Sequence, residues 1–176
     1  MTRVTVILGD ITEQAVDAIV NPANKWLGKG GGVTGAIHRR AGPKFTEECY
    51  LVGRCETAEA KLTRGHNLPA RHVIHTVGPE YGFEKGSEAE ILRLCYRNTL
   101  HLAKKHDIKT LAFPSLATGS FRYPPEEAVP IALSTIKEFI GESDHFEEIR
   151  FVLFSEEIFH LYKEGAKEVL KDYNSL

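Results

Sequence analysis

The sequence is poor in cysteine, has no long apolar run and carries no excess of charge of either sign. Its three cysteines are an odd number without Cys-x-x-Cys spacing, which predicts neither a disulfide framework nor a common zinc site. We therefore expect reduced thiols and a cytoplasmic location. The longest apolar runs, Val4 to Leu8 and Phe151 to Phe154, fall far short of the roughly 20 residues that span a bilayer, so we expect no membrane partner.

The charge balance also argues against nucleic acid as a partner. The 22 Lys and Arg residues against 24 Asp and Glu residues leave a net charge of −2, so the chain has no general basic field. The basic pairs Arg39-Arg40 and Lys104-Lys105 are isolated. The length of 176 residues, 42% of them hydrophobic, predicts one domain over residues 1–176 that buries its own core.

Short β-branched runs alternate with segments in which apolar residues recur at helical spacing. Ser87 and Glu90 have the spacing of a capping box at the start of one helix, and Gly141 is expected to end another. This alternation predicts an α/β fold with a mixed, largely parallel central sheet and no internal domain boundary. The expected strands cover residues 4–8, 17–20, 60–63, 72–77, 109–113 and 149–154; the expected helices include 33–41, 45–52, 91–103, 126–139 and 159–170.

Ligands of such sheets bind beyond the carboxyl ends of the strands. Asp10, Asn24, the pair Thr118-Gly119 and the pair Phe154-Ser155 each follow an expected strand. We therefore expect these residues, which are far apart in the chain, to converge on one crevice.

A cluster of glycines follows Asn24 and precedes the helix expected at 33–41. Gly30 to Gly35 formally satisfies the dinucleotide-binding pattern G-x-G-x-x-G, but residues 24–27 separate it from the preceding strand, and the region around Glu47 looks helical instead of supplying an acidic residue after a strand. The Rossmann interpretation is therefore disfavoured. Backbone N–H groups of this cluster and of a second loop at 117–121 suit phosphate oxygens, which indicates a diphosphate, although ordinary turns have the same composition.

Several motifs occur together in an order and spacing that span nearly the whole chain. Together they resemble the macro domain family, close to its branch of MacroD-type hydrolases. The motifs are Gly9-Asp10-Ile11-Thr12, Asp17-Ala18-Ile19-Val20-Asn21-Pro22-Ala23-Asn24, Gly30-Gly31-Gly32-Val33, Ala36-Ile37-His38, Val73-Ile74-His75-Thr76-Val77-Gly78-Pro79, and Ala112-Phe113-Pro114-Ser115 followed by Thr118-Gly119.

The resemblance implies a three-layer α/β/α sandwich that holds ADP-ribose at the carboxyl edge of its sheet. It assigns Asp10, supported by Ile11, to the adenine amino group, Phe154 to stacking on adenine and Asn24 to the distal ribose. Two loops would wrap the diphosphate and distal ribose with backbone N–H groups: Gly30, Gly31, Gly32 and Val33 in the first, and Ala117, Thr118, Gly119, Ser120 and Phe121 in the second.

Taken without the resemblance, several of these residues also have purely structural interpretations. An Asp after a strand is commonly a turn or cap residue, and a lone Phe commonly packs in a core. Asn21, directly before Pro22, is expected to fix the backbone of its loop. His75, inside an apolar strand, is expected to be a hydrogen-bonded core histidine.

The sequence departs from the MacroD-type pattern at Thr34, where those hydrolases usually carry an aspartate. Thr34 cannot act as a general base, and losing such a base typically slows a reaction by about 10²–10⁴-fold. His38, four residues later, is a candidate for positioning the ribose or water and equally a candidate surface residue. Arg122 stands where related loops often have glycine, and either reaches the diphosphate or points to solvent.

Two functions follow from the resemblance. The first is hydrolysis of ester-linked ADP-ribose, either O-acetyl-ADP-ribose or mono-ADP-ribosyl groups on acidic side chains of proteins, with Asn24 and His38 as catalytic candidates. The reaction would need no metal or other cofactor. The alternative is a module that binds ADP-ribose without turning it over, which the missing carboxylate at Thr34 favours.

Overall fold

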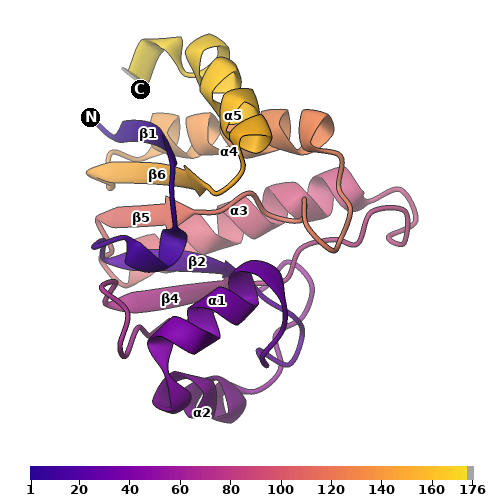
Figure 1. Ribbon diagram of the computed structural model, residues 1–176. Coiled ribbons are helices and arrows are strands. Elements are labelled where there is room, and N and C mark those ends of the chain that lie inside the picture. Colours follow the sequence, from indigo (N-terminus) through magenta and orange to yellow (C-terminus); the bar gives the residue numbers. More distant parts are fainter. Residues whose placement is uncertain (174–176) are drawn as a thin grey trace.

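The computed structural model describes residues 1–173 and contains a six-stranded sheet with helices on both faces (Figure 1). The strands are β1 (Arg3–Leu8), β2 (Ala18–Pro22), β3 (Ala60–Arg64), β4 (His72–Thr76), β5 (Thr110–Phe113) and β6 (Glu148–Leu153). The helices are α1 (Gly32–Ala41), α2 (Pro43–Val52), α3 (Glu88–Lys105), α4 (Pro125–Glu142) and α5 (Glu156–Val169), with 3₁₀ turns η1 (Ile11–Glu13) and η2 (Lys171–Tyr173).

The strands lie in the order β1-β6-β5-β2-β4-β3 and are parallel except for the antiparallel pair of β3 and β4. The prediction of a mixed, largely parallel sheet is therefore confirmed. Strands buried on both faces need continuous apolar runs, and the β-branched runs of the sequence supply them. The register pairs Leu8 of β1 with Leu153 of β6, so the loops after these two strands begin side by side.

Helices cover the sheet in two separate layers. Helices α1 and α2 pack on one face, and α3, α4 and α5 pack on the other (Figure 1). Each layer encloses its own hydrophobic core, one around Ile37 and Phe45 and a larger one around Phe113 and Leu133. The structure thus confirms the three-layer α/β/α sandwich.

One predicted helix start is correct without its predicted capping bond, and one predicted helix end is wrong. Ser87 precedes α3, but its side chain makes no capping bond; instead the N–H of Glu84 donates to the Glu88 carboxylate at 3.1 Å. Gly141 does not end α4, which continues through Glu142. One helical glycine costs only about 1 kcal/mol, and neighbouring buried side chains outweigh that cost.

The three cysteines are buried and unbridged, as expected. Burial raises the pKa of the Cys49 and Cys95 thiols to about 12 and that of Cys55 to about 11. None of the helices within residues 1–173 combines the length and apolar composition that crossing a membrane requires.

Candidate functional site

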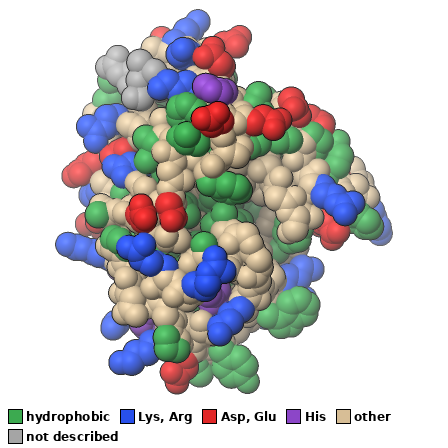
Figure 2. Space-filling model, in the orientation of Figure 1, with side chains coloured by type: hydrophobic (Ala, Val, Ile, Leu, Met, Phe, Trp, Pro, Cys, Tyr) green, Lys and Arg blue, Asp and Glu red, His purple; other side chains and the backbone are tan. Residues whose placement is uncertain are grey.

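A cavity of about 670 Å³ opens at the carboxyl ends of β2, β4, β5 and β6. Figure 2 shows it as a hollow near the middle of the face in view, with hydrophobic side chains at its bottom. The size falls in the range of sites for small ligands, about 300–1,000 Å³. The predicted convergence is confirmed for Asn24, Thr118-Gly119 and Phe154-Ser155, all of which line this main pocket.

The first wall of the main pocket is the glycine cluster at the start of α1. The cap residue Gly31 offers no side chain to the helix, so the N–H groups of the first turn remain available beside the pocket. Gly35 must be glycine, because a Cβ there would lie 2.4 Å from the Gly30 carbonyl oxygen. The close approach of loop and helix therefore shapes this wall. Gly30, Gly31, Gly32 and Val33 all line it, as predicted.

Asn24 shapes the loop that leads into this wall. Its Oδ1 accepts hydrogen bonds from the N–H groups of Trp26 and Gly28, both at 3.1 Å. Its Nδ2 donates to the Gly28 carbonyl at 3.0 Å. One amide hydrogen of Asn24, which lines the pocket, remains for a ligand.

The second wall is the loop from Pro114 to Phe121. Ala117 has a positive φ of 66°. A Cβ added to Gly78 would lie only 3.2 Å from the Ala117 Cβ, so the loop packs closely against Gly78. Within residues 1–173, the N–H groups of residues 117–121 donate no hydrogen bond to the protein. They are therefore free to bind an anionic ligand, as predicted for Ala117, Thr118, Gly119, Ser120 and Phe121, which all line the pocket.

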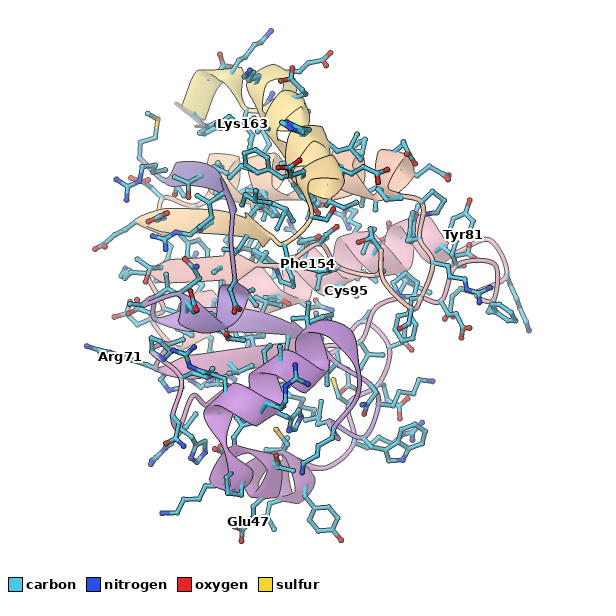
Figure 3. All side chains as sticks on the ribbon, viewed as in Figure 1. Glu47, Arg71, Tyr81, Cys95, Phe154 and Lys163 are labelled. Atoms are coloured by element: carbon cyan, nitrogen blue, oxygen red, sulfur yellow. The ribbon has the colours of Figure 1, made fainter. Side chains whose placement is uncertain are left out.

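Phe154 stands at one end of the main pocket, between β6 and α5 (Figure 3). Its side chain is 80% exposed, so the interpretation as a core residue is wrong. An exposed aromatic ring on the wall of a pocket offers a flat apolar surface to a planar ligand.

Asp10 and Ile11 are not among the residues that line the main pocket. Asp10 Oδ1 accepts from the Thr12 N–H at 2.9 Å and from Oγ1 of the same residue at 2.7 Å, so the carboxylate caps η1. The N–H of Gly9 donates to the Leu153 carbonyl, which keeps Asp10 near the Phe154 end of the pocket. Contact between Asp10 and adenine remains a prediction.

His38 also lies outside the main pocket, which corrects its predicted catalytic position. It is 4% exposed, its Nδ1 lies 2.8 Å from Thr46 Oγ1, and its ring packs edge-on against Phe45. It borders a separate, smaller cavity with Lys29 and Arg39. Burial and the nearby charge of Lys29 lower the pKa of His38, so the ring is neutral at pH 7. Geometry gives it a packing role.

Thr34 lines the main pocket, but its hydroxyl is turned toward the protein. Its Oγ1 lies 2.9 Å from both Asn21 Oδ1 and the Pro22 carbonyl oxygen. Asn21 Nδ2 in turn lies 3.0 Å from His75 Nδ1, and His75 Nε2 lies 2.9 Å from Thr63 Oγ1. His75 is fully buried and hydrogen-bonded, which confirms its structural interpretation. Asn21 is also fully buried, but it lies in β2 and its side chain bonds Thr34 and His75, so it does not fix the backbone of a loop as predicted.

The lining of the main pocket is uncharged. Among its residues, all within the described part of the chain, there is no Asp, Glu, His, Lys or Arg, and the exposed Arg122 is not one of them. A negatively charged ligand would therefore rely on backbone N–H groups. Ser115 and Gly78, which had no predicted role, also line the pocket. Each lies two residues beyond the end of a strand, β5 and β4 respectively, and this position is the signal in the sequence that could have identified them.

Comparisons with known proteins agree with this geometry. A family model described as the macro domain matches residues 20–132. A macro domain-containing protein of Chlorobaculum tepidum is 49% identical over 159 residues, or 90% of this chain and 92% of that protein. The ADP-ribose glycohydrolase MACROD2 of Homo sapiens is 46% identical over 168 residues, or 94% of this chain and 40% of that longer protein.

Solved structures show the same fold. The Oceanobacillus iheyensis macrodomain with ADP superposes with a TM-score of 0.89 at 40% identity, covering 94% of this chain and 90% of that one. The Trypanosoma brucei macrodomain in complex with ADP-ribose gives a TM-score of 0.84 at 40% identity, covering 89% of this chain and 66% of that one. Motifs, fold and relatives lead to one conclusion: the chain belongs to the macro domain family.

Proposed function

We propose that the protein binds ADP-ribose in the main pocket and hydrolyses ester-linked ADP-ribose derivatives. One observation carries the proposal: the uncharged pocket of about 670 Å³ joins two loops of free N–H groups to an exposed aromatic ring. A nucleotide sugar has the matching parts, because its diphosphate suits the N–H groups and its adenine suits the ring. The relatives named as ADP-ribose glycohydrolases support the same ligand.

In this arrangement the ligand lies along the pocket with adenine against Phe154. The diphosphate lies between the start of α1 and the loop 117–121, and the distal ribose reaches Asn24. Asp10 Oδ2 is the candidate acceptor for the adenine amino group, because its Oδ1 already caps η1.

The proposed reaction adds water to the ester, so that the bond between acyl carbon and sugar oxygen is replaced and ADP-ribose and a carboxylic acid are released. No lining side chain is a general base, so a phosphate oxygen of the ligand itself accepts the proton of the attacking water. Positioning by the two loops supplies the remaining rate enhancement. The reaction uses no metal or cofactor. A cytoplasmic site for it is part of the proposal and rests on the unbridged thiols.

Calorimetry with ADP-ribose tests the binding proposal. We expect Phe154→Ala to weaken binding by roughly tenfold, because stacking of a base on an aromatic ring contributes about 1–3 kcal/mol to binding. Phe83→Ala is the matched control, because Phe83 is 74% exposed but does not line the pocket. Failure of the wild-type protein to bind ADP-ribose would refute the proposed function.

Turnover is tested with two substrates, O-acetyl-ADP-ribose and a protein mono-ADP-ribosylated on acidic side chains. Release of ADP-ribose from either substrate above the rate in buffer supports hydrolysis, and the faster substrate identifies the physiological leaving group. Rates equal to buffer for both exclude the enzyme.

A second candidate function is a reader that binds ADP-ribose on modified proteins without cleaving it. The specific observation in its favour is Thr34, whose hydroxyl is held by Asn21 and Pro22 and cannot activate water. Tight binding of ADP-ribose without turnover of either substrate would identify a reader.

A further inference from the structure

Behind the second wall of the pocket, four hydroxyl groups from three elements form a hydrogen-bonded chain. Tyr96 of α3 and Tyr162 of α5 are buried, with their hydroxyl oxygens 3.3 Å apart. Tyr162 Oη lies 3.3 Å from Ser115 Oγ, and Ser115 Oγ lies 2.9 Å from Thr118 Oγ1. The chain thus runs from the core to two residues that line the main pocket.

The direction of donation along this chain follows from its inner end. The N–H of Leu116 donates to Tyr96 Oη at 3.3 Å, so the Tyr96 hydrogen must go to another acceptor. Within residues 1–173 the remaining hydrogen-bond partner of that oxygen is Tyr162, which therefore receives it. Burial raises the pKa of both phenols, so both keep their hydrogens. Tyr162 then donates outward to Ser115 Oγ.

The outward direction leaves a hydroxyl hydrogen at the pocket wall. Thr118 Oγ1 donates to Ser115 Oγ at 2.9 Å, so Ser115 Oγ accepts hydrogen bonds from both Tyr162 and Thr118. The hydroxyl hydrogen of Ser115 itself has no protein acceptor within residues 1–173. A ligand oxygen at normal hydrogen-bond distance would accept this hydrogen.

The position of Ser115 identifies the part of the ligand that it meets. Strand β5 pairs with β6 through Phe113 and Phe151, so Ser115 lies beside the end of β6 that leads to Phe154. The loop of free N–H groups, by contrast, begins only at Ala117. Ser115 is therefore placed between the adenine end of the pocket and its diphosphate loop, where the ribose next to adenine would lie.

We infer that Ser115 is a specificity-determining residue that hydrogen-bonds a hydroxyl of the adenosine ribose, held in orientation by Tyr162 as a positioning residue. This inference rests on the proposed function. The Ser115 hydroxyl already accepts two hydrogen bonds and has one hydrogen to donate, and a neutral sugar hydroxyl can accept that hydrogen. The site would therefore select a nucleotide that carries both ribose hydroxyls over one that lacks the hydroxyl bound by Ser115.

The test compares the binding of ADP, 2′-deoxy-ADP and 3′-deoxy-ADP by calorimetry. We expect the wild-type protein to bind one deoxy analogue about 3–10-fold more weakly than ADP, the usual value of one hydrogen bond. Ser115→Ala should bind ADP and that analogue equally, and Tyr162→Phe should reduce the ratio. The ratio is informative because damage to the pocket would weaken both ligands together.

Two control variants should keep the wild-type ratio: Ser134→Ala, an exposed serine on α4, and Tyr50→Phe, an 82% exposed tyrosine on α2. If Ser115→Ala unfolds, Ser115→Cys keeps the volume with a weak donor and should also lose the ratio. Equal binding of all three ligands by the wild type, or an unchanged ratio in the Ser115 variant, would overturn the inference. Failure of wild type to bind ADP-ribose would instead overturn the proposed function.

Discussion

At the scale of single residues, Thr34 sets the direction of a buried polar chain. Its hydroxyl donates toward Asn21 Oδ1 and the backbone carbonyl oxygen of Pro22, and Nδ2 of the Asn21 amide then donates to His75 Nδ1. His75 consequently carries its proton on Nε2 and donates to Thr63 Oγ1. A residue at the pocket wall thus fixes the tautomer of a histidine in the core.

We predict that Thr34→Asp raises the rate of ester hydrolysis by about 10²–10⁴-fold, because the new carboxylate supplies a general base. The carboxylate would meet two carbonyl oxygens in the present arrangement, so Asn21 must turn its amide nitrogen toward it. His75 must then move its proton to Nδ1. Turnover assays measure the first effect, and ¹⁵N NMR of the imidazole measures the second.

Thr34→Asn is the matched control for this prediction, since it has the shape of aspartate without its charge. ADP-ribose affinity should change only a few-fold in both variants. Equal hydrolysis rates in the Asp and Asn variants would contradict the assignment of the missing base to this position.

At the scale of elements, the fit between the glycine loop and α1 controls the pocket. A Cβ at Gly35 would lie 2.4 Å from a backbone oxygen of Gly30, and neither backbone segment can move away cheaply. At Gly31, by contrast, an added Cβ would meet no atom within 4 Å. The two glycines therefore have different roles. Gly35 allows close packing of the loop on α1, and Gly31 leaves the start of the helix open.

We expect Gly35→Ala to lower the free energy of unfolding by about 1–3 kcal/mol, the usual cost of overpacking, and to weaken ADP-ribose binding by displacing the loop. Gly31→Ala should lower the free energy of unfolding by only about 0.5–1 kcal/mol, because alanine is a poorer N-cap than glycine but its Cβ meets no atom. Urea unfolding of both variants measures the difference. Equal stabilities would show that the loop is not held by this contact.

At the scale of the whole molecule, the buried polar chain makes folding sensitive to acid. Burial, with a smaller contribution from His38, lowers the pKa of His75 to about 3. A histidine in the unfolded chain has a pKa near 6.5. Below that pH the unfolded chain therefore binds a proton at His75, whereas the folded chain does not. Stability should therefore fall as the pH decreases from about 6.5 toward 3.

The expected slope from His75 is about 1.4 kcal/mol of unfolding free energy per pH unit, measured by urea unfolding between pH 6 and 5. This pH range lies above the pH range in which protonation of Glu148 changes the stability. Burial opposes the charge of Glu148, but hydrogen bonds from Arg150, Thr5 and Arg3 outweigh it and lower its pKa to about 2. The Glu148 contribution is therefore lost only below about pH 4.5.

His75→Gln should reduce the slope between pH 6 and 5, whereas His101→Gln, which changes an exposed histidine on α3, should not. His38, whose pKa is also lowered, leaves a residual slope of the same sign. An unchanged slope in the His75 variant would show that another group governs the acid sensitivity.

The sequence by itself determined the elements and the order of the chemistry along the chain. Periodicity predicted the strands and helices, because burial on one or two faces imposes a repeat that is visible without a structure. The position of the glycine cluster and of loop 117–121 at the pocket was also predictable, since small side chains leave backbone N–H groups open. Ser87 correctly marked the start of α3, whereas the predicted helix end at Gly141 was wrong because a local preference of about 1 kcal/mol yields to tertiary packing.

Only the tertiary structure decided which side of each element faces the pocket. Phe154 lies one residue beyond β6 and is exposed, whereas His38, on the helix that begins at the pocket, points away from it. The contacts of Thr34 with Asn21, and of Ser115 with Tyr162, join residues 13 and 47 positions apart. Such contacts depend on the crossing of distant segments, and no local pattern in the sequence encodes that crossing.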